Sequence, residues 1–306
     1  MTTGTSISDR LTGSFTALIT PFRQGRVDEA ALRGLVDHQL DHGTAGLVPC
    51  GTTGEAATMR DAEQDRVIAT VVERAAGRVP VIAGTGGNDT RHAIERTRRA
   101  RALGADAALV VAPYYTRPTQ DGLIAHFTAI AAAVDLPIVL YNVPGRTGVN
   151  ISPETVARLA TVPGIAGIKE ASGVVDQVSQ IVRETPPSFA VLSGDDSLTL
   201  PIVSVGGRGV ISVVANLVPG AMARLVAASL TDDLTTARAW HHDLFDLCRA
   251  MFLDNNPIAV KTAAGLLGLC SPEMRLPLTP MSEANRRRLE AALAACPHVR
   301  PVAVAA

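Results

Sequence analysis

A lysine stands in the middle of an apolar segment, GIAGIKEASG, at residues 164–173. The chain has only two lysines, Lys169 and Lys261, among 28 basic residues, so lysine at position 169 needs a chemical reason. Burial disfavours a charged ammonium and favours the neutral amine, which is a nucleophile for carbonyl carbons. Arginine cannot do this because its guanidinium stays protonated. Lys169 is therefore predicted to form a Schiff base.

Other polar side chains also follow apolar segments, and all three tyrosines of the chain are among them. A phenol can move protons during imine chemistry. Hydroxyls and loop N–H groups can hold a carboxylate, and a guanidinium fork suits another. Each feature alone is common in loops and cores, but together they predict one site. The polar segments concerned are Gly51-Thr52-Thr53-Gly54-Glu55, Tyr114-Tyr115, Tyr141, Arg146 and Gly194-Asp195-Asp196.

Eight apolar segments that alternate with amphipathic ones must position these residues. Continuous apolar runs are typical of parallel strands covered on both faces. The strands are expected at 14–22, 45–50, 79–85, 106–113, 137–144, 165–171, 189–195 and 209–215. The helices are expected at 28–43, 61–77, 121–134, 153–160, 176–184, 197–204 and 219–230, and beyond the strands at 235–252, 256–269 and 282–295.

This alternation predicts an α/β fold, a (β/α)8 TIM barrel over residues 1–232 with a C-terminal helical extension over 233–306. A doubly wound open sheet is the alternative, but no G-x-G-x-x-G follows the first strand. In a barrel, the carboxyl ends of the strands form one rim, so the polar residues above are expected to converge there.

Strict alternation along the strand decides which way Lys169 points. It groups Lys169 with Ile165 and Gly167 on the barrel interior, where Gly167 leaves room for the long side chain. It puts Ala166 and Ile168 on the other face.

Each lysine also has a structural interpretation. An ion pair with Glu170 is the alternative role for Lys169, but Glu170 is expected on the opposite face of the strand. Lys261 lies in a predicted helix beyond the barrel, where a surface or packing role is expected.

Composition excludes several classes of function. A net charge of −1 and 3% aromatic residues give no basic field and no stacking platform for nucleic acid. No apolar run reaches membrane-spanning length, and the N-terminus lacks signal-peptide features. Cysteines without C-x-x-C spacing favour free thiols and the cytoplasm. Cys50 is expected to be a packed thiol, and the pair His38 and His42 lacks a third metal ligand, so no metal site is predicted.

Taken together, the motifs resemble the dihydrodipicolinate synthase family, within the wider superfamily of pyruvate-dependent Schiff-base aldolases. The resemblance runs from about Gly13 to about Pro280. Its motifs are GTTGE at 51–55, PYYTRP at 113–118, YNVPGRTG at 141–148, GIKEASG at 167–173, LSGDD at 192–196, GVISV at 209–213 and NPIAVK at 256–261.

The resemblance implies catalytic roles. Lys169 would form the Schiff base with pyruvate, and Tyr141 would donate and accept protons. Thr52 and Tyr115 would complete a proton relay, with Tyr115 reached from a neighbouring subunit. A homotetramer built from tight dimers is expected.

The resemblance also implies how substrates bind, with no cofactor. Thr53 and the backbone at Ile211 would bind pyruvate, and Gly194 would also belong to the substrate-binding residues. Arg146 would receive the carboxylate of L-aspartate 4-semialdehyde, condensed with pyruvate in lysine biosynthesis. An aldolase or lyase for a sugar acid or hydroxy-oxo acid is the alternative, although such enzymes usually lack this arginine. A non-catalytic oxo-acid-binding paralogue is a third possibility.

One departure from the family pattern yields a prediction about regulation. Lysine-inhibited members carry a polar cluster that Asn88 and Tyr114 match here. The chain has Ala56, Asp61, Gln64 and His92 where Ser, His, His and Glu are common. Histidine instead of an acid removes the partner of the effector's ammonium group. We expect lysine to inhibit weakly or not at all, and a titration showing strong inhibition below millimolar lysine would contradict this.

Overall fold

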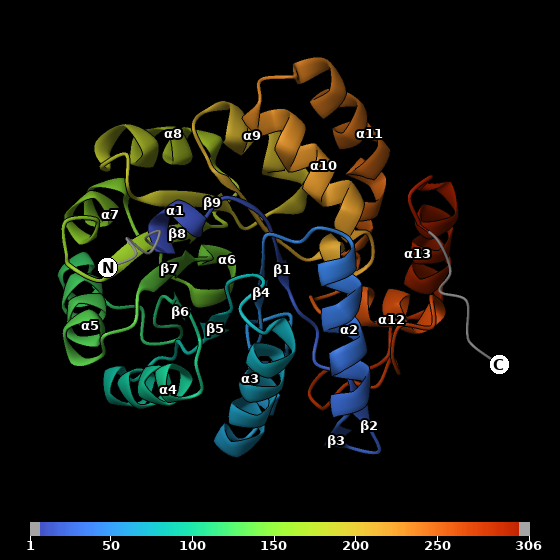
Figure 1. The fold of residues 1–306 in the computed structure, drawn as a ribbon, viewed down its shortest axis with the longest axis horizontal. Helices are drawn as coiled ribbons and strands as arrows, with labels where there is room; N and C mark the ends of the chain where they lie inside the picture. The colour runs from blue at the N-terminus through green and yellow to red at the C-terminus, as the bar shows by residue number, and fades with distance from the viewer. Residues whose placement is uncertain (1–6, 300–306) are drawn as a thin grey trace.

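Eight parallel strands form the centre of the molecule, in a computed structural model that describes residues 7–299. They are β1 (Gly13–Ala17), β4 (Gly46–Val48), β5 (Ile82–Gly84), β6 (Ala107–Val111), β7 (Ile138–Asn142), β8 (Ile165–Glu170), β9 (Ala190–Ser193) and β10 (Gly209–Ser212). Their order is β4-β1-β10-β9-β8-β7-β6-β5, and a bridge between Leu47 and Val81 joins the two ends. The sheet thus closes into the predicted (β/α)8 barrel (Figure 1).

Helices surround the strands, and three more follow on the outside of the ring (Figure 1). The surrounding helices are α2 (Glu29–Asp41), α3 (Asp61–Ala75), α4 (Thr90–Ala102), α5 (Gln120–Ala133), α7 (Pro153–Leu159), α8 (Val175–Glu184), α9 (Thr199–Ser204) and α10 (Pro219–Leu230). The C-terminal helices are α11 (Leu234–Ala250), α12 (Ile258–Leu266) and α13 (Glu283–Ala295). No helix between residues 7 and 299 has the length and apolar character needed to cross a bilayer.

The sequence pattern predicts all eight barrel strands, but it misses several other elements. Helix α4 is arginine-rich and buries only Ala93, Thr97 and Ala100, so its apolar period is too weak to recognise. The pattern also misses the short α1 (Ile7–Arg10), α6 (Pro144–Thr147), the hairpin of β2 (Phe22–Arg23) with β3 (Arg26–Val27), and the 3-10 turns η1 (Ala56–Thr58), η2 (Asp196–Leu198) and η3 (Val214–Asn216).

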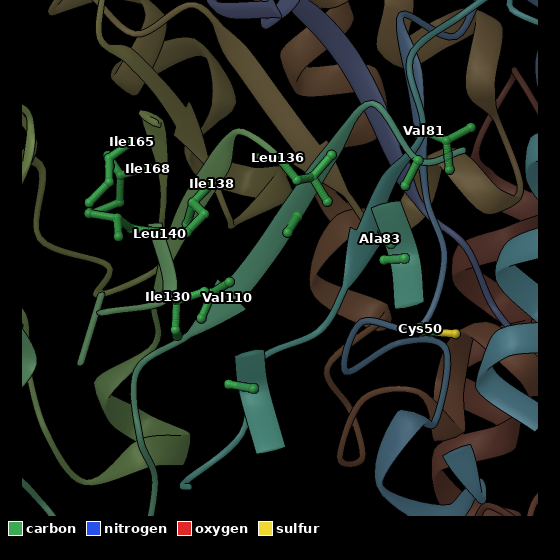
Figure 2. Packing of buried hydrophobic residues seen from close by; sticks show 14 of the residues in the cluster. Cys50, Val81, Ala83, Val110, Ile130, Leu136, Ile138, Leu140, Ile165 and Ile168 are labelled. Carbon is green, nitrogen blue, oxygen red and sulfur yellow. The ribbon is translucent and has the colours of Figure 1, made fainter. Parts of the chain in front are cut away.

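Two apolar cores lie on the two sides of the barrel wall. In β7, Val139 and Tyr141 belong to the cluster inside the barrel, whereas Ile138 and Leu140 belong to the cluster between strands and helices. Figure 2 shows part of this outer cluster, in which strand residues pack against helix residues such as Ile130. The alternation leaves an inner surface on which a few polar groups stand among apolar ones.

Strand β8 departs from strict alternation. Ile138 pairs with Ile165 but Val139 pairs with Gly167, so β8 contains one extra residue opposite β7. This β-bulge turns Ala166 into the inner core and places Ile165 with Ile168 in the outer one (Figure 2). The expected faces of Ile165 and Ala166 are therefore wrong, because the bulge shifts the alternation by one residue.

The C-terminal helices share an apolar core with the barrel. Leu244 of α11 and Leu289 of α13 belong to the same buried cluster as Ile19 and Val210, which lie in the barrel segment. The extension therefore packs on the barrel directly. A domain boundary at residue 232 stays a prediction.

Candidate active site

Lys169 and Tyr141 stand side by side inside the barrel. The register of β7 and β8 pairs Tyr141 with Lys169, and Lys169 Nζ lies 4.5 Å from the centroid of the Tyr141 ring. Lys169 is 4% exposed and Tyr141 is 7% exposed. Lys169 also pairs with Leu192 of the inner core, which confirms that it faces the interior.

Glu170 faces away from Lys169, as alternation predicts. Its carboxylate accepts hydrogen bonds from Asn142 Nδ2 at 2.9 Å, Gln177 Nε2 at 3.2 Å and Ser172 N at 2.7 Å. Among residues 7–299, neither Lys169 nor Glu170 takes part in an ion pair. A structural salt bridge between them is thus excluded as the reason for a lysine at position 169.

Two glycines shape the space around the Lys169 side chain. A Cβ on Gly194 would lie 3.1 Å from Lys169 Cε and 2.6 Å from the Ala171 Cβ, so only glycine fits there. A Cβ on Gly167 would instead lie 2.5 Å from the Ala190 carbonyl oxygen in β9. Gly167 therefore permits close strand packing, and Gly194 makes the room that the sequence analysis attributes to Gly167.

A cavity of about 330 Å³ opens above this pair. Thr52, Tyr114, Tyr141 and Arg146 line it, together with Asn256 from the C-terminal segment. Lys169 does not line the cavity. Its ammonium group lies against the ring of Tyr141, and Tyr141 does line the cavity. A phenol, a hydroxyl and a guanidinium thus line one cavity at the carboxyl ends of the strands, and the amine of Lys169 lies against the phenol ring.

Asn256 connects two of the predicted substrate-binding residues. Its side-chain Nδ2 donates to Thr53 Oγ1 at 2.9 Å, and its backbone carbonyl oxygen accepts from the Arg146 guanidinium at 3.3 Å. Thr53 and Asn256 are both buried, while Arg146 is exposed. Because Thr53 accepts from Asn256, its own hydroxyl hydrogen is free to be donated elsewhere.

Lys261 lies beneath the loop that carries the two threonines. Its ammonium donates to Glu55 Oε1 at 2.5 Å and to the Thr20 carbonyl at 2.9 Å, and it stands 4.3 Å from the centre of the Phe22 ring. Lys261 is fully buried, so a surface position for it is wrong. Burial lowers the pKa of Lys261 against the opposing effect of Glu55. This ion pair fastens the threonine loop to α12.

The adjacent tyrosines of the PYYTRP segment have different environments. Tyr114 lines the cavity and is 40% exposed, whereas Tyr115 is 89% exposed and does not line it. Tyr115 also has a φ of 71°, which is uncommon for a bulky residue. Its part in a proton relay stays a prediction that requires a second subunit.

Ile211 belongs to the core cluster inside the barrel, and a buried carboxylate holds the backbone two and three residues after it. Asp196 Oδ2 accepts from the backbone N–H groups of Val213 at 3.1 Å and Val214 at 3.0 Å. Burial raises the pKa of Asp196 to about 6, although these hydrogen bonds oppose the effect. Asp196 thereby fixes the backbone just after Ile211.

Asp61 and His92, two of the positions at which the chain departs from lysine-inhibited members of the family, form an ion pair with each other. Asp61 accepts from His92 at 3.2 Å and from Arg96 at 3.1 Å, and Arg99 lies 3.0 Å away. Burial works to raise the pKa of Asp61, but His92 and the two arginines together lower it. The Asp61 carboxylate that contacts His92 is thus already paired with cations.

Cys50 is buried beside the threonine loop. Its Sγ lies 3.6 Å from the Gln64 carbonyl oxygen, and burial raises the pKa of the thiol. A packed thiol fits these observations better than a reactive one. Of the two histidines considered for a metal, His42 directs Nδ1 to the His38 carbonyl oxygen at 2.7 Å.

Residues 10–296 match the model of the dihydrodipicolinate synthetase family. The chain belongs to this family. It is 58% identical over 288 residues to a 4-hydroxy-tetrahydrodipicolinate synthase from Thermomicrobium roseum, covering 94% of this chain and 95% of that protein.

Solved structures of the family have the same fold. The dihydrodipicolinate synthase of Aquifex aeolicus has a TM-score of 0.91 at 48% identity, covering 92% of this chain and 97% of its own. The chloride-inhibited enzyme of Acinetobacter baumannii, solved in complex with pyruvate, has a TM-score of 0.93 at 44% identity, covering 94% and 100%.

The sequence pattern does not predict two features of the candidate site, which are the position of Asn256 and the Glu55–Lys261 ion pair. Both involve the NPIAVK segment, which lies some 200 residues from the threonine loop. One signal was present, because Lys261 is the only lysine besides Lys169. The spacing gave no way to place it beneath the loop.

The buried ion pair generates a stability prediction. Lys261→Met keeps the length of the side chain but leaves the Glu55 carboxylate buried without its cation, which is expected to cost roughly 3–5 kcal/mol. The midpoint of thermal unfolding should fall, and adding Glu55→Gln should restore much of it. Arg33→Met, at the exposed pair with Glu73, should leave the midpoint of thermal unfolding nearly unchanged. If Lys261→Met and Arg33→Met lowered the unfolding midpoint equally, the buried ion pair would not be the more stabilising of the two.

Proposed function

We propose that this protein is a 4-hydroxy-tetrahydrodipicolinate synthase whose nucleophile is Lys169. It condenses pyruvate with L-aspartate 4-semialdehyde in the diaminopimelate route to lysine. The observation that carries the proposal is the buried Lys169–Tyr141 pair beneath a cavity lined by Thr52 and Arg146. The family to which the chain belongs supports the activity, and the pyruvate held by the related Acinetobacter baumannii enzyme supports the first substrate.

The reaction begins with attack of the neutral Lys169 amine on the ketone carbon of pyruvate. Loss of water gives an imine, and loss of a proton from the adjacent methyl group gives an enamine. The enamine carbon forms a bond to the aldehyde carbon of the second substrate. The amine of that substrate then attacks the imine carbon, closes the ring and displaces Lys169.

Tyr141 is assigned the proton transfers because its ring lies against Lys169 and lines the cavity. It would protonate the departing hydroxyl during imine formation and return protons when the ring closes. Thr52 extends this relay on the same cavity wall. Tyr115 from a second copy of the chain completes it, and its exposure on its own subunit leaves it available for such a contact.

The two carboxylates of the substrates are assigned to different walls. Thr53, with its hydroxyl hydrogen left free by Asn256, binds the carboxylate of pyruvate with the backbone at Ile211 and Gly194. Arg146 binds the carboxylate of the aldehyde through its guanidinium. Asn256 orients both, since its side chain contacts Thr53 and its carbonyl contacts Arg146.

The assembly and the compartment belong to the same proposal. We expect a homotetramer made of two tight dimers, in which each dimer exchanges Tyr115 between its subunits. A cytoplasmic location is supported by four cysteines that are free in the described part of the chain.

Trapping with borohydride tests the nucleophile. Pyruvate with borohydride should attach a stable adduct to the peptide containing Lys169 and leave the peptide containing Lys261 unmodified. Lys169→Ala should lose nearly all activity and the adduct, because no other amine lies in the barrel interior among residues 7–299. An enzyme that binds pyruvate without forming the adduct would favour a non-catalytic paralogue.

Arg146 is tested by the kinetics of the second substrate. Arg146→Ala should reduce kcat/KM for aspartate semialdehyde roughly 10- to 100-fold through the loss of charged hydrogen bonds, while pyruvate trapping stays near the wild-type rate. Arg158→Ala, at an exposed ion pair with Asp121, is the matched control and should change neither quantity. A rise confined to the KM for pyruvate would refute the assignment.

A further inference from the structure

A buried carboxylate lies directly behind the predicted catalytic pair, on the other side of the barrel wall. The register of β7 and β8 pairs Tyr141 with Lys169 and then Asn142 with Glu170. The residue after each member of the pair therefore points into the outer layer. Glu170 is 1% exposed and Asn142 is fully buried. The Tyr141–Lys169 pair inside the barrel and the Asn142–Glu170 pair outside it are thus joined through the backbone of β7 and β8.

Burying the Glu170 carboxylate at this position costs free energy of folding. Within residues 7–299 its carboxylate has no cationic partner, and its hydrogen-bond donors are the neutral groups of Asn142, Gln177 and Ser172. A buried carboxylate without a cation costs several kcal/mol unless its hydrogen bonds are well formed. Packing alone would be served by an apolar side chain, so the network itself needs a reason.

The network fastens both ends of the segment that carries Arg146. Asn142 Oδ1 accepts from Ile151 N at 3.0 Å, and Asn142 Nδ2 donates to Asn150 Oδ1 at 2.7 Å. Residue 142 precedes the segment 143–149 and residues 150 and 151 follow it. The turn containing Arg146 is therefore closed at its base by Asn142.

The same network fastens the loop after Lys169. Gln177 Nε2 donates to Glu170 and to Asn150 Oδ1, and its Oε1 accepts from Asn150 Nδ2 at 2.8 Å. Glu170 Oε1 accepts from Ser172 N. The Glu170 carbonyl accepts from Gly194 N at 2.7 Å, which sets the glycine that borders the Lys169 side chain. One hydrogen-bonded cluster thus reaches the surroundings of Lys169, Tyr141 and Arg146.

We propose that Glu170 and Asn142 form a positioning pair for this reaction, which touches no substrate but fixes the nucleophile, the proton donor and the Arg146 segment in one arrangement. The proposal rests on the proposed function. It explains a carboxylate that is buried without a cation, because its acceptor oxygens are needed by donors from both strands and both loops.

Reversal of the donor and acceptor tests the pair. Glu170→Gln sets an amide donor against the donors of Asn142 and Gln177, and Asn142→Asp sets two acceptors against each other. Each single variant should lower kcat and the rate of pyruvate trapping roughly 10- to 100-fold, as expected when reacting groups are displaced by a fraction of an ångström to an ångström. The double variant exchanges the two roles and should recover a clear part of both rates.

A matched control separates positioning from general stability. Ser229→Ala removes a buried hydrogen bond to the Leu225 carbonyl oxygen, 2.8 Å long, and Ser229 shares no hydrogen-bond partner with the network. It should lower the midpoint of thermal unfolding and leave kcat unchanged. If Glu170→Gln does not fold, Gln177→Met replaces it, since Gln177 is only partly buried. That variant should slow trapping in the same direction by a smaller factor.

The outcomes are distinct. Folded Glu170→Gln or Gln177→Met protein with the wild-type kcat and trapping rate would overturn the positioning role while leaving the proposed function intact. Slow single variants with no recovery in the folded double variant would also overturn it, because the pairing would not be the cause. A wild-type protein that forms no adduct would overturn the function and this inference together.

Discussion

The pairing of β7 with β8 is the constraint on which the site depends. It places Lys169 against Tyr141 within the barrel and Glu170 against Asn142 outside it. A bulge at Ala166 sets this register, because the extra residue restores the inward direction for Gly167 and Lys169. Without the bulge, Ile165 and Ile168 could not both pack in the outer core, where the structure has them.

The two lysines use the same side chain for opposite purposes. Lys169, the proposed nucleophile, is buried and has no anionic partner among the described residues. Lys261 is equally buried but has Glu55 and the Thr20 carbonyl as acceptors, so its charge is used to hold a loop. A compact ammonium at the end of a flexible stem suits both places. The two lysines therefore differ in the groups that surround them: Lys261 is paired with Glu55, and Lys169 has no such partner among the described residues.

The C-terminal segment completes a site that the barrel strands only begin. Asn256 contacts Thr53 and Arg146, Lys261 holds Glu55, and Arg275 donates to Glu63 at 2.6 Å while stacking on Phe22. These contacts cross some 110 to more than 240 positions of sequence. The extension shares an apolar core with the barrel, which keeps the contacts in place.

The sequence by itself determined the eight strands and the barrel, because these follow from local periodicity. The choice of lysine over arginine indicated that Lys169 faces the interior. It also grouped Tyr141, Thr52 and Arg146, because the carboxyl ends of parallel strands share one rim. Only the tertiary structure decided the faces of Ile165 and Ala166, the place of Lys261 and the contacts of Asn256 and Glu170. A bulge depends on pairing with a second strand, and hydrogen bonds between distant segments leave no period in the sequence. Such contacts are fixed by packing of the whole chain, and a pattern read along a single segment carries no record of them.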